Sequence, residues 1–440
     1  MPKPKPTLDL ASATTIVVAS MIGAGVYTTS GYSLSALQDP RLVLLAWVVG
    51  GIIAICGAIG YASLASRFSE SGGEYLFLSK TLHPIAGVMA GWVSLLAGFT
   101  GAIAVAALSL GQYLAPMIPS MSLSDTTIAI SCVGIAGILH AIGVRFAARV
   151  QDTIVIAKLL MIVAFILFAF ASWDQWAGKS PQISVGMDQS PIDKVFVFAK
   201  QLVWISFSYL GFNAAIYISG EVRQPKRNVP RSMILGTICV TVIYLLLNAT
   251  FVFAPSAETI LQDENLPQIA AVAAQSLGGD LLETFVRIVI VVSLFTSVSA
   301  LVMTGPRVYA KMAEDGFLHN WFAIHRTTPT RAILFQSAAA MFAISISTLT
   351  ELLGYLGMTL SLCSALTVGT LFLLKKRGEA IWLPGKGIPA LIYIAATLIL
   401  AGLYGFSEPR SAIATCVTLL IGLVAYPFFN KKTVTEPQDL

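Results

Sequence analysis

The feature that most constrains this chain is a series of long apolar runs that covers nearly all of it. Twelve runs of roughly 20 or more residues follow one another, separated by short polar segments. A run of about 20 apolar residues is long enough to cross the hydrocarbon core of a bilayer as a helix. Charged residues make up only 11% of the chain, against about 25% in a soluble domain. We therefore expect an all-α integral membrane protein in a lipid bilayer.

The expected spans follow one another without a soluble domain between them. They cover residues 10–36, 41–65, 84–115, 126–144, 150–172, 194–219, 232–254, 281–312, 331–350, 352–374, 388–406 and 411–430. Residues 10–430 are thus predicted to form one unit between tails of residues 1–9 and 431–440. With the N-terminus inside, 20 of the 27 lysines and arginines fall on the cytoplasmic side, as the positive-inside rule requires. Both tails are therefore expected in the cytoplasm.

The first span contains a motif that weakens it as a helix. Residues 22–31 read IGAGVYTTSG, with Gly23 and Gly25 near the middle of the span. Glycine inside a helix costs about 1 kcal/mol relative to alanine. Small residues at this spacing also let two helices pack closely. The motif predicts either a close helix contact or a deliberate break, and alone it does not decide between them.

The sixth span carries a matching interruption. Residues 204–221 read WISFSYLGFNAAIYISGE and gather serine, tyrosine, glycine and asparagine at mid-span. Transporters with inverted repeats carry interrupted helices in pairs, one in each half. We therefore expect breaks at residues 23–25 and 207–211, with residues 10–172 and 194–374 as two five-span halves and residues 388–430 as two added helices. Unwound residues free backbone groups that line a cavity, and half-helix N-termini there attract an anion.

Four segments carry a resemblance to a known family. They are SMIGAGVYTTSG (20–31), SESGGEYLFL (69–78), FSYLGFNAAIYISGEVRQPKRNVPRS (207–232) and GPRVYAKMAEDGFLHNWFAIHRTTPTRA (305–332). On these residues the chain resembles amino acid permeases of the amino acid–polyamine–organocation superfamily. The resemblance runs over most of spans one to ten. It implies twelve transmembrane helices, a five-plus-five inverted repeat with discontinuous helices one and six, and an amino acid bound at the two breaks.

The resemblance also implies roles for particular residues. The substrate carboxylate would rest on the N–H groups of Gly23, Ala24 and Gly25, and the ammonium would meet carbonyls at residues 20–22 and 207–209. Phe207 matches the aromatic gate that closes over the substrate. Many relatives have serine where this chain has Ala24, so a hydroxyl contact is absent here. The expected substrate-binding set is Ile22, Gly23, Ala24, Gly25, Phe207, Ser208, Tyr209 and Gly211.

Lys158 is a lysine in the middle of the fifth span. It follows Arg149 by nine residues, about 13 Å along a helix, which places it near mid-membrane. It either snorkels to the inner interface or faces the bundle interior and marks an ion or proton path. Some prokaryotic members of the family place a lysine in span five where sodium-coupled relatives bind sodium. We expect Lys158 to couple transport to protons, whereas Lys200 and Arg287 are expected to snorkel or to pair near the outer vestibule.

Ser297 in span eight lies ten residues before Arg307, at a depth like that of Lys158. Its hydroxyl is expected to serve proton coupling as a partner of the lysine, or else to bond back to its own helix. A pocket for the substrate side chain is expected from spans three, six, eight and ten. Its residues would be Ser94, Phe99, Phe207, Phe212 and Ser361.

Other function classes lack their signatures. AGKS at residues 177–180 resembles the end of a phosphate loop, but Trp173 stands where that loop needs its first glycine. The histidines are scattered and the cysteines lie in apolar stretches without metal-ligand spacing. A channel would show a filter segment or repeated pore-lining charges, and a membrane enzyme or sensor would show clustered acids or histidines. We expect no enzyme activity, no cofactor, no metal and no nucleic-acid partner.

The sequence thus favours a secondary active transporter of amino acids. A substrate cation usually needs a carboxylate in the cavity, and the candidate acids map to span ends, so a neutral amino acid is favoured. Proton coupling without sodium is expected, in a bacterial inner membrane. An amino acid or amine exchanger, or a carrier of cationic amino acids or polyamines with the same fold, remains the alternative. The particular substrate and the oligomeric state stay open.

Overall fold

The computed structural model describes residues 8–68, 73–142, 148–176, 190–262, 264–314, 316–322 and 329–429. Residues 1–7 of the expected N-terminal tail and all of the C-terminal tail lie outside this part of the chain. Within it, every regular element is a helix, and an isolated backbone bridge joins Leu8 to Val222. The prediction of an all-α chain is therefore confirmed.

The helices follow the expected spans closely. In chain order they are α1 Leu10–Met21, α2 Ala24–Leu37, α3 Pro40–Arg67, α4 Gly73–Thr81, α5 Pro84–Val93, the π-helical segment η1 Ser94–Gly101, α6 Ala102–Leu114, α7 Asp125–Ala141, α8 Ala148–Ala171, α9 Trp173–Trp176, α10 Pro191–Ser208, α11 Ala214–Tyr217, α12 Pro225–Phe253, α13 Ala257–Ile260, α14 Ile269–Glu314, α15 Thr330–Ile346, α16 Leu349–Lys376, α17 Ile388–Ser407 and α18 Pro409–Phe429.

In the described part of the chain, eight helices are long and apolar enough to cross a membrane, and the bent pair of α1 and α2 makes a ninth. The apolar helices α7 and α15 have only 17 residues each. α10 ends where the sixth expected span is interrupted. Each of the twelve expected ranges holds a helix, while twelve membrane crossings and an internal repeat remain predictions.

Two long helices depart from regular α-geometry. α14 begins well before the expected eighth span, and Gly278 and Gly279 interrupt it; Gly279 has φ +65°, a conformation that glycine adopts without strain. The third span is π-helical between Ser94 and Gly101. Such wide turns are rare and are frequently found at functional sites. Two of the expected pocket residues, Ser94 and Phe99, lie in this π-helical segment.

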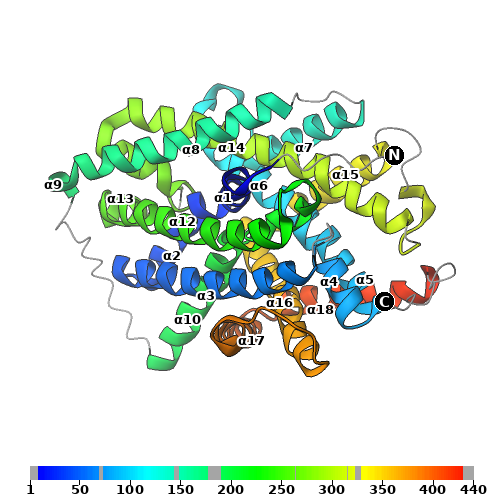
Figure 1. The fold of residues 1–440 in the computed structure, drawn as a ribbon. Coiled ribbons are helices and arrows are strands. Elements are labelled where there is room, and N and C mark those ends of the chain that lie inside the picture. Colours follow the sequence, from blue (N-terminus) through cyan, green and yellow to red (C-terminus); the bar gives the residue numbers. More distant parts are fainter. Residues whose placement is uncertain are drawn as a thin grey trace.

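The first span lies inside the bundle rather than at its rim. Figure 1 shows α1 near the centre of the view, between α8 and α12. α1 packs against α12, which in turn packs along α3, while α2 packs against α10. Trp47 of α3, Tyr209 after α10 and Tyr244 of α12 form a buried aromatic cluster, with ring centroids 5.2–5.7 Å apart. The two expected breaks are thereby held in the core.

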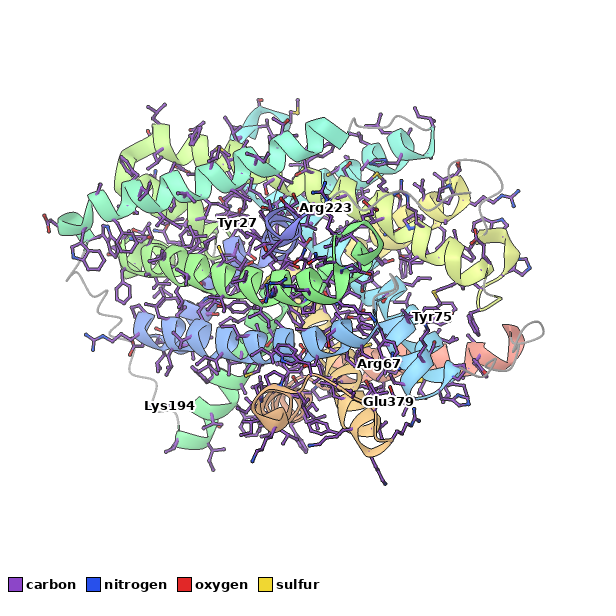
Figure 2. All side chains as sticks on the ribbon, viewed as in Figure 1. Tyr27, Arg67, Tyr75, Lys194, Arg223 and Glu379 are labelled. Atoms are coloured by element: carbon purple, nitrogen blue, oxygen red, sulfur yellow. The ribbon has the colours of Figure 1, made fainter. Side chains whose placement is uncertain are left out.

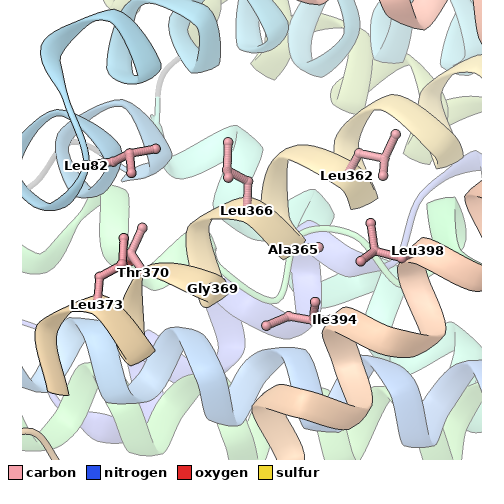
Figure 3. A pocket seen from close by; sticks show the side chains of 9 residues that line it. All are labelled: Leu82, Leu362, Ala365, Leu366, Gly369, Thr370, Leu373, Ile394 and Leu398. Carbon is pink, nitrogen blue, oxygen red and sulfur yellow. The ribbon is translucent and has the colours of Figure 1, made fainter. Parts of the chain in front are cut away.

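The outer helices present apolar surface, as lipid contact requires. A groove of about 340 Å³ lies between α16 and α17, and Leu82, the residue after α4, also lines it (Figure 3). Leu366 and Leu398 on its walls are about half exposed. Charged side chains gather at helix ends instead, as in the pair of Arg67 and Glu379, 3.2 Å apart (Figure 2). The groove is apolar and peripheral, whereas the two breaks lie in the core.

Candidate substrate site at two interrupted helices

The first span is broken between α1 and α2. Ile22 and Gly23 are extended, and the two helices meet at 42°. α2 starts at Ala24, so the break is shorter than the expected residues 23–25, and Ala24 and Gly25 are helical. Gly23 offers no side chain to cap α2, and the first four N–H groups of a helix have no partner inside it. The N-terminal end of α2 therefore presents uncapped N–H groups at the break.

The two glycines of the motif have different surroundings. A Cβ at Gly23 would have no neighbouring atom within 4 Å, so this residue borders open space. A Cβ at Gly25 would lie 2.2 Å from Ser208 Oγ and 2.9 Å from Ser208 Cα. Both interpretations of the motif are therefore correct, each at its own glycine: Gly23 lies in the break and Gly25 allows a close helix contact.

The sixth span is broken over residues 209–213, between α10 and the short α11. Phe207 and Ser208, expected within the break, are the last residues of α10 instead. Gly211 has φ +103°, and a Cβ there would lie 2.8 Å from Ser20 O. Gly211 thus supplies both a conformation that other residues rarely adopt and room for the backbone of α1.

The two breaks face each other directly. Gly211 lies against Ser20 at the end of α1, and Ser208 lies against Gly25 at the start of α2. The hydroxyl of Ser208 is 3.4 Å from that of Thr29, one turn further along α2. Ile22, Ala24 and Ser208 are all buried. Of the expected binding residues, Gly25 and Ser208 are therefore in direct contact in the core, and Gly211 lies beside the end of α1.

Lys158 of α8 reaches this place. Its Nζ donates a hydrogen bond of 2.8 Å to Ile22 O, and only 4% of the residue is exposed. The snorkelling interpretation is therefore wrong for this lysine. The other cations inside spans are paired with acids: Lys200 with Glu408, and Arg287 with Glu283. Lys158 differs from both because its ammonium is bonded to a carbonyl freed by the break.

Tyr244 of α12 is a second donor at the break, and it was not among the residues predicted from the sequence. Its hydroxyl lies 2.6 Å from Met21 O and 3.0 Å from Ser208 O, so it reaches the ends of both α1 and α10. Two consecutive carbonyls, those of Met21 and Ile22, thus receive side-chain donors. A tyrosine in an apolar run gives no signal of its own, because its ring suits a buried position with or without a role for the hydroxyl.

The expected partner of Lys158 in span eight bonds elsewhere. Ser297 donates to Ser293 O at 3.0 Å, one turn back in its own helix. A serine in a helix interior often satisfies its hydroxyl in this way. The alternative interpretation of Ser297 therefore describes the structure, and the bonded partner of Lys158 is Ile22.

The expected pocket residues, and Tyr209 of the expected binding set, lie in different surroundings. Phe207 is half-buried at the end of α10, and Phe99 of the π-helical segment packs on Tyr309 at 6.1 Å. Tyr209 instead turns toward α3 and donates to Trp47 O at 3.0 Å. Phe212 packs edge-on against Tyr61 of α3. Ser94 lies in the π-helical segment and Ser361 in α16, both half-buried.

The two broken spans also meet at their far ends. Leu8 N donates to Glu221 O and Arg223 N donates to Leu8 O, at 3.0 and 2.8 Å. Next to this bridge, Asp9 caps α1 and accepts a hydrogen bond of 2.8 Å from Ser12 N. That backbone hydrogen bond, together with nearby Arg223, holds the pKa of Asp9 below its ordinary value. A short backbone bridge therefore ties the start of span one to the end of span six.

Comparison with known proteins places the chain among characterised sequences. The model of the amino acid permease family matches residues 8–429. The chain is 27% identical over 436 residues to the serine/threonine exchanger SteT of Bacillus subtilis, covering 97% of this chain and 96% of the relative. It is 26% identical over 434 residues to the large neutral amino acids transporter small subunit 2 of Homo sapiens, covering 97% and 80%. It is 27% identical over 438 residues to the human b(0,+)-type amino acid transporter 1, covering 96% and 87%.

Proposed function

The chain belongs to the amino acid permease family, and we propose that it moves neutral amino acids across the membrane by alternating access at its two broken spans. Membership of this family makes it an amino acid transporter and not an enzyme. The amino acid substrate class comes from the family. The preference for a neutral substrate comes from this chain, because its candidate acids map to span ends in the sequence. Glu74, the acid that reaches the broken sixth span, has both carboxylate oxygens hydrogen-bonded to side chains of the protein.

The observation that carries the proposal is the pair of breaks that face each other in the core. An amino acid carries an anionic and a cationic group, and the breaks offer complementary ends to both. The uncapped N–H groups at Ala24 and Gly25 and the positive end of the α2 dipole suit the carboxylate. A carbonyl oxygen has two lone pairs, so Met21 and Ile22 retain one each for the ammonium. Phe207 would close over the bound substrate.

We assign proton coupling to Lys158. Its hydrogen bond to Ile22 O is strong because the donor is a charged ammonium. Loss of the proton would leave a neutral amine, whose hydrogen bond to that carbonyl is weaker and more easily replaced by another donor. A lysine in this position also supplies the positive charge that sodium would supply in a sodium-dependent carrier. Transport is then expected to depend on pH and to be independent of sodium. Ser297, bonded to its own helix, is left without a direct part in this step.

The same proposal includes the arrangement in the membrane. Twelve crossings, with an inverted repeat of residues 10–172 and 194–374, place the two breaks near the bilayer centre. The distribution of lysine and arginine supports a cytoplasmic position of both termini, and we propose that the membrane is the inner membrane of a bacterial cell. The protein would move its substrate across the inner membrane.

The purified protein in liposomes tests the proposal. We expect radiolabelled uptake of one or more of serine, threonine, alanine and leucine, tested singly, to be stimulated by an inward proton gradient and unchanged when sodium replaces potassium. Thermal stabilisation of the detergent-solubilised protein by the same amino acids measures binding without transport. Stabilisation and uptake with cationic amino acids or polyamines only would overturn the neutral-substrate assignment.

Exchange is the second candidate function, because one named relative is a serine/threonine exchanger. An exchanger returns to its starting state only with a substrate bound, so it carries no net flux. Liposomes preloaded with the unlabelled amino acid are expected to distinguish the two. Uptake that requires preloading indicates exchange, whereas uptake into empty liposomes driven by a proton gradient indicates symport.

A further inference from the structure

A buried carboxylate lies beyond the break of the sixth span, away from the candidate substrate groups. Glu74 of α4 is only 8% exposed. Its Oε1 accepts hydrogen bonds from Tyr61 OH at 2.9 Å and Asn213 Nδ2 at 2.5 Å, and its Oε2 accepts from Tyr217 OH at 2.6 Å. Of these three donors, Asn213 is the last residue of the break and Tyr217 follows it in α11.

The backbone around Glu74 is shaped to receive this part of the sixth span. Gly73, directly before it, has φ +60°, and a Cβ there would lie 2.4 Å from the ring of Tyr217. Only glycine combines this conformation with such a close approach. The ring of Tyr217 is therefore held against the start of α4 while its hydroxyl bonds to the neighbouring carboxylate.

The other anchor of this segment is aromatic. Phe212 is 2% exposed and packs edge-on against Tyr61 at 5.4 Å and against Tyr393 of α17 at 6.4 Å. Tyr61 thus contacts the segment twice, through its ring to Phe212 and through its hydroxyl to Glu74. Residues 212–217 are consequently docked on α3, α4 and α17 and not only connected through the chain.

The chemistry of these contacts depends on the carboxylate. Each donor to Glu74 is a neutral hydroxyl or amide, and the nearby groups of α16 and α17, Cys363 and Tyr393, are neutral as well. An ionised carboxylate only accepts hydrogen bonds and has sites for all three donors. Hydrogen bonds to a charged group are stronger than neutral ones. Replacing the carboxylate by an amide removes the charge and turns one accepting atom into a donor, so the hydrogen bonds that remain are neutral and weaker.

We propose that Glu74 is a positioning residue of the transport cycle, whose carboxylate holds residues 212–217 of the broken sixth span in place and must release them for the cycle to proceed. The inference rests on the proposed function, because it treats the sixth span as a moving part. Glu74 does not touch the candidate substrate groups, so its effect is on the rate of the cycle and not on substrate affinity.

The first experiment measures the segment itself and needs no substrate. In Glu74→Gln we expect amide hydrogen exchange of residues 212–221 to be at least about tenfold faster than in the parent, because two hydrogen bonds from this segment no longer end on a charge. Exchange in α12 and α16 should stay within about twofold. Unchanged exchange of residues 212–221 in a folded Glu74→Gln protein would overturn the proposal. Because this measurement does not involve transport, its failure is distinct from failure of the proposed function.

The second experiment separates binding from turnover. Glu74→Gln is expected to change the apparent affinity for the amino acid by less than about threefold while the maximal uptake rate falls about tenfold, and Glu74→Asp should recover part of that rate. Tyr217→Phe removes one donor and keeps the ring, so it carries the test if Glu74→Gln fails to fold. Tyr355→Phe removes a hydroxyl that bonds to Thr418 in another part of the protein and serves as the control. If Tyr217→Phe and Tyr355→Phe have equal maximal uptake rates and Tyr217→Phe has a reduced affinity instead, the positioning role is contradicted.

Discussion

The two breaks differ in length and in what holds them. The break in span one takes only Ile22 and Gly23, and side-chain donors from α8 and α12 hold its freed carbonyls. The break in span six takes residues 209–213 and leads into a helix of four residues. There a carboxylate accepts hydrogen bonds from side chains of the segment itself. The first break is fixed through its backbone and the second through its side chains.

This difference indicates how the two spans divide their tasks. A backbone held at consecutive carbonyls keeps a fixed pattern of groups, which suits recognition of the part that all amino acids share. A segment anchored by two side-chain hydrogen bonds can leave its position by exchanging those bonds for others. We therefore assign recognition mainly to span one and movement mainly to span six, and the following substitutions test that division.

The largest effect is expected at Gly25. In Gly25→Val the new Cβ would lie within 2.9 Å of the Ser208 backbone, which cannot move without shifting α10. The branched side chain also fills the space between the breaks. We expect loss of substrate-induced thermal stabilisation and loss of uptake to below about a tenth of the parent rate. Normal uptake by this variant would place the carboxylate site elsewhere.

Gly23→Ala is the matched control for Gly25→Val. Gly23 is extended, with φ −134°, and borders open space, so alanine fits there without strain. We expect a folded protein whose affinity falls because the methyl group occupies substrate space, while the unliganded protein keeps its thermal stability. Equal destabilisation of the unliganded protein by the two variants would show that both glycines serve packing alone.

The sequence located both breaks but not their extent. A glycine pair indicates a weak point in a helix. A second interruption in span six is expected because inverted-repeat transporters carry broken helices in pairs. Whether a given glycine is unwound depends on its neighbours: Gly25 stays helical because Ser208 packs on it, which only the tertiary structure shows. For the same reason Phe207 and Ser208 remain in α10 while the chain turns only after them.

The next largest effect is expected at Lys158. In Lys158→Met the side chain keeps its length and loses the donor to Ile22 O, while the cost of burying an ammonium disappears. We expect the protein to fold and to bind substrate, with proton-driven uptake reduced about tenfold and its pH dependence flattened. Sodium-stimulated uptake in the parent, with Lys158→Met unchanged, would contradict the coupling assignment.

The role of Lys158 could be predicted from its charge, whereas the roles of Tyr244 and Glu74 could not be predicted from the sequence. A lysine within a span costs about 3 kcal/mol on insertion scales, so its presence indicates a role. A tyrosine has no such cost, and an acid near a span end is commonly just exposed to water, so its presence does not indicate a role. Tyr244 and Glu74 acquire their roles because other segments bring partners to them, and one sequence does not state those distances.

A smaller effect is expected at Tyr244, which joins the two breaks through one hydroxyl. Tyr244→Phe keeps the ring in its aromatic cluster and removes the donor to Met21 O and Ser208 O. A neutral hydrogen bond contributes about 1 kcal/mol, so we expect affinity to fall about fivefold. Tyr113→Phe removes a hydroxyl that donates to Tyr27 O, a carbonyl inside α2, and is the control. If the two variants lose the same amount of affinity, the hydrogen bond from Tyr244 to the break contributes no more to binding than a hydrogen bond elsewhere in the protein.

The smallest effect is expected at Asp9, where the two spans meet outside the core. The hydrogen bond from Ser12 N depresses the pKa of Asp9 below the ordinary 3.8. Its contribution to stability is therefore present above pH 3.8 and is lost as the pH falls through the lower, folded-state pKa. Asp9→Ala should lower Tm by about 2 °C or less at pH 7, and the difference from the parent should narrow below about pH 4.

Asp39→Ala provides the comparison that decides what Asp9 does beyond capping. Asp39 caps α3 by accepting from Arg41 N at 2.8 Å, the same chemistry on an unbroken helix. If the bridge between Leu8 and Val222 helps to couple the broken spans, Asp9→Ala should slow uptake more than Asp39→Ala at equal loss of Tm, because only Asp9 adjoins that bridge. If the two variants take up substrate equally well, the bridge does not couple the two spans. Spans one and six would then be coupled only through the contacts between their breaks.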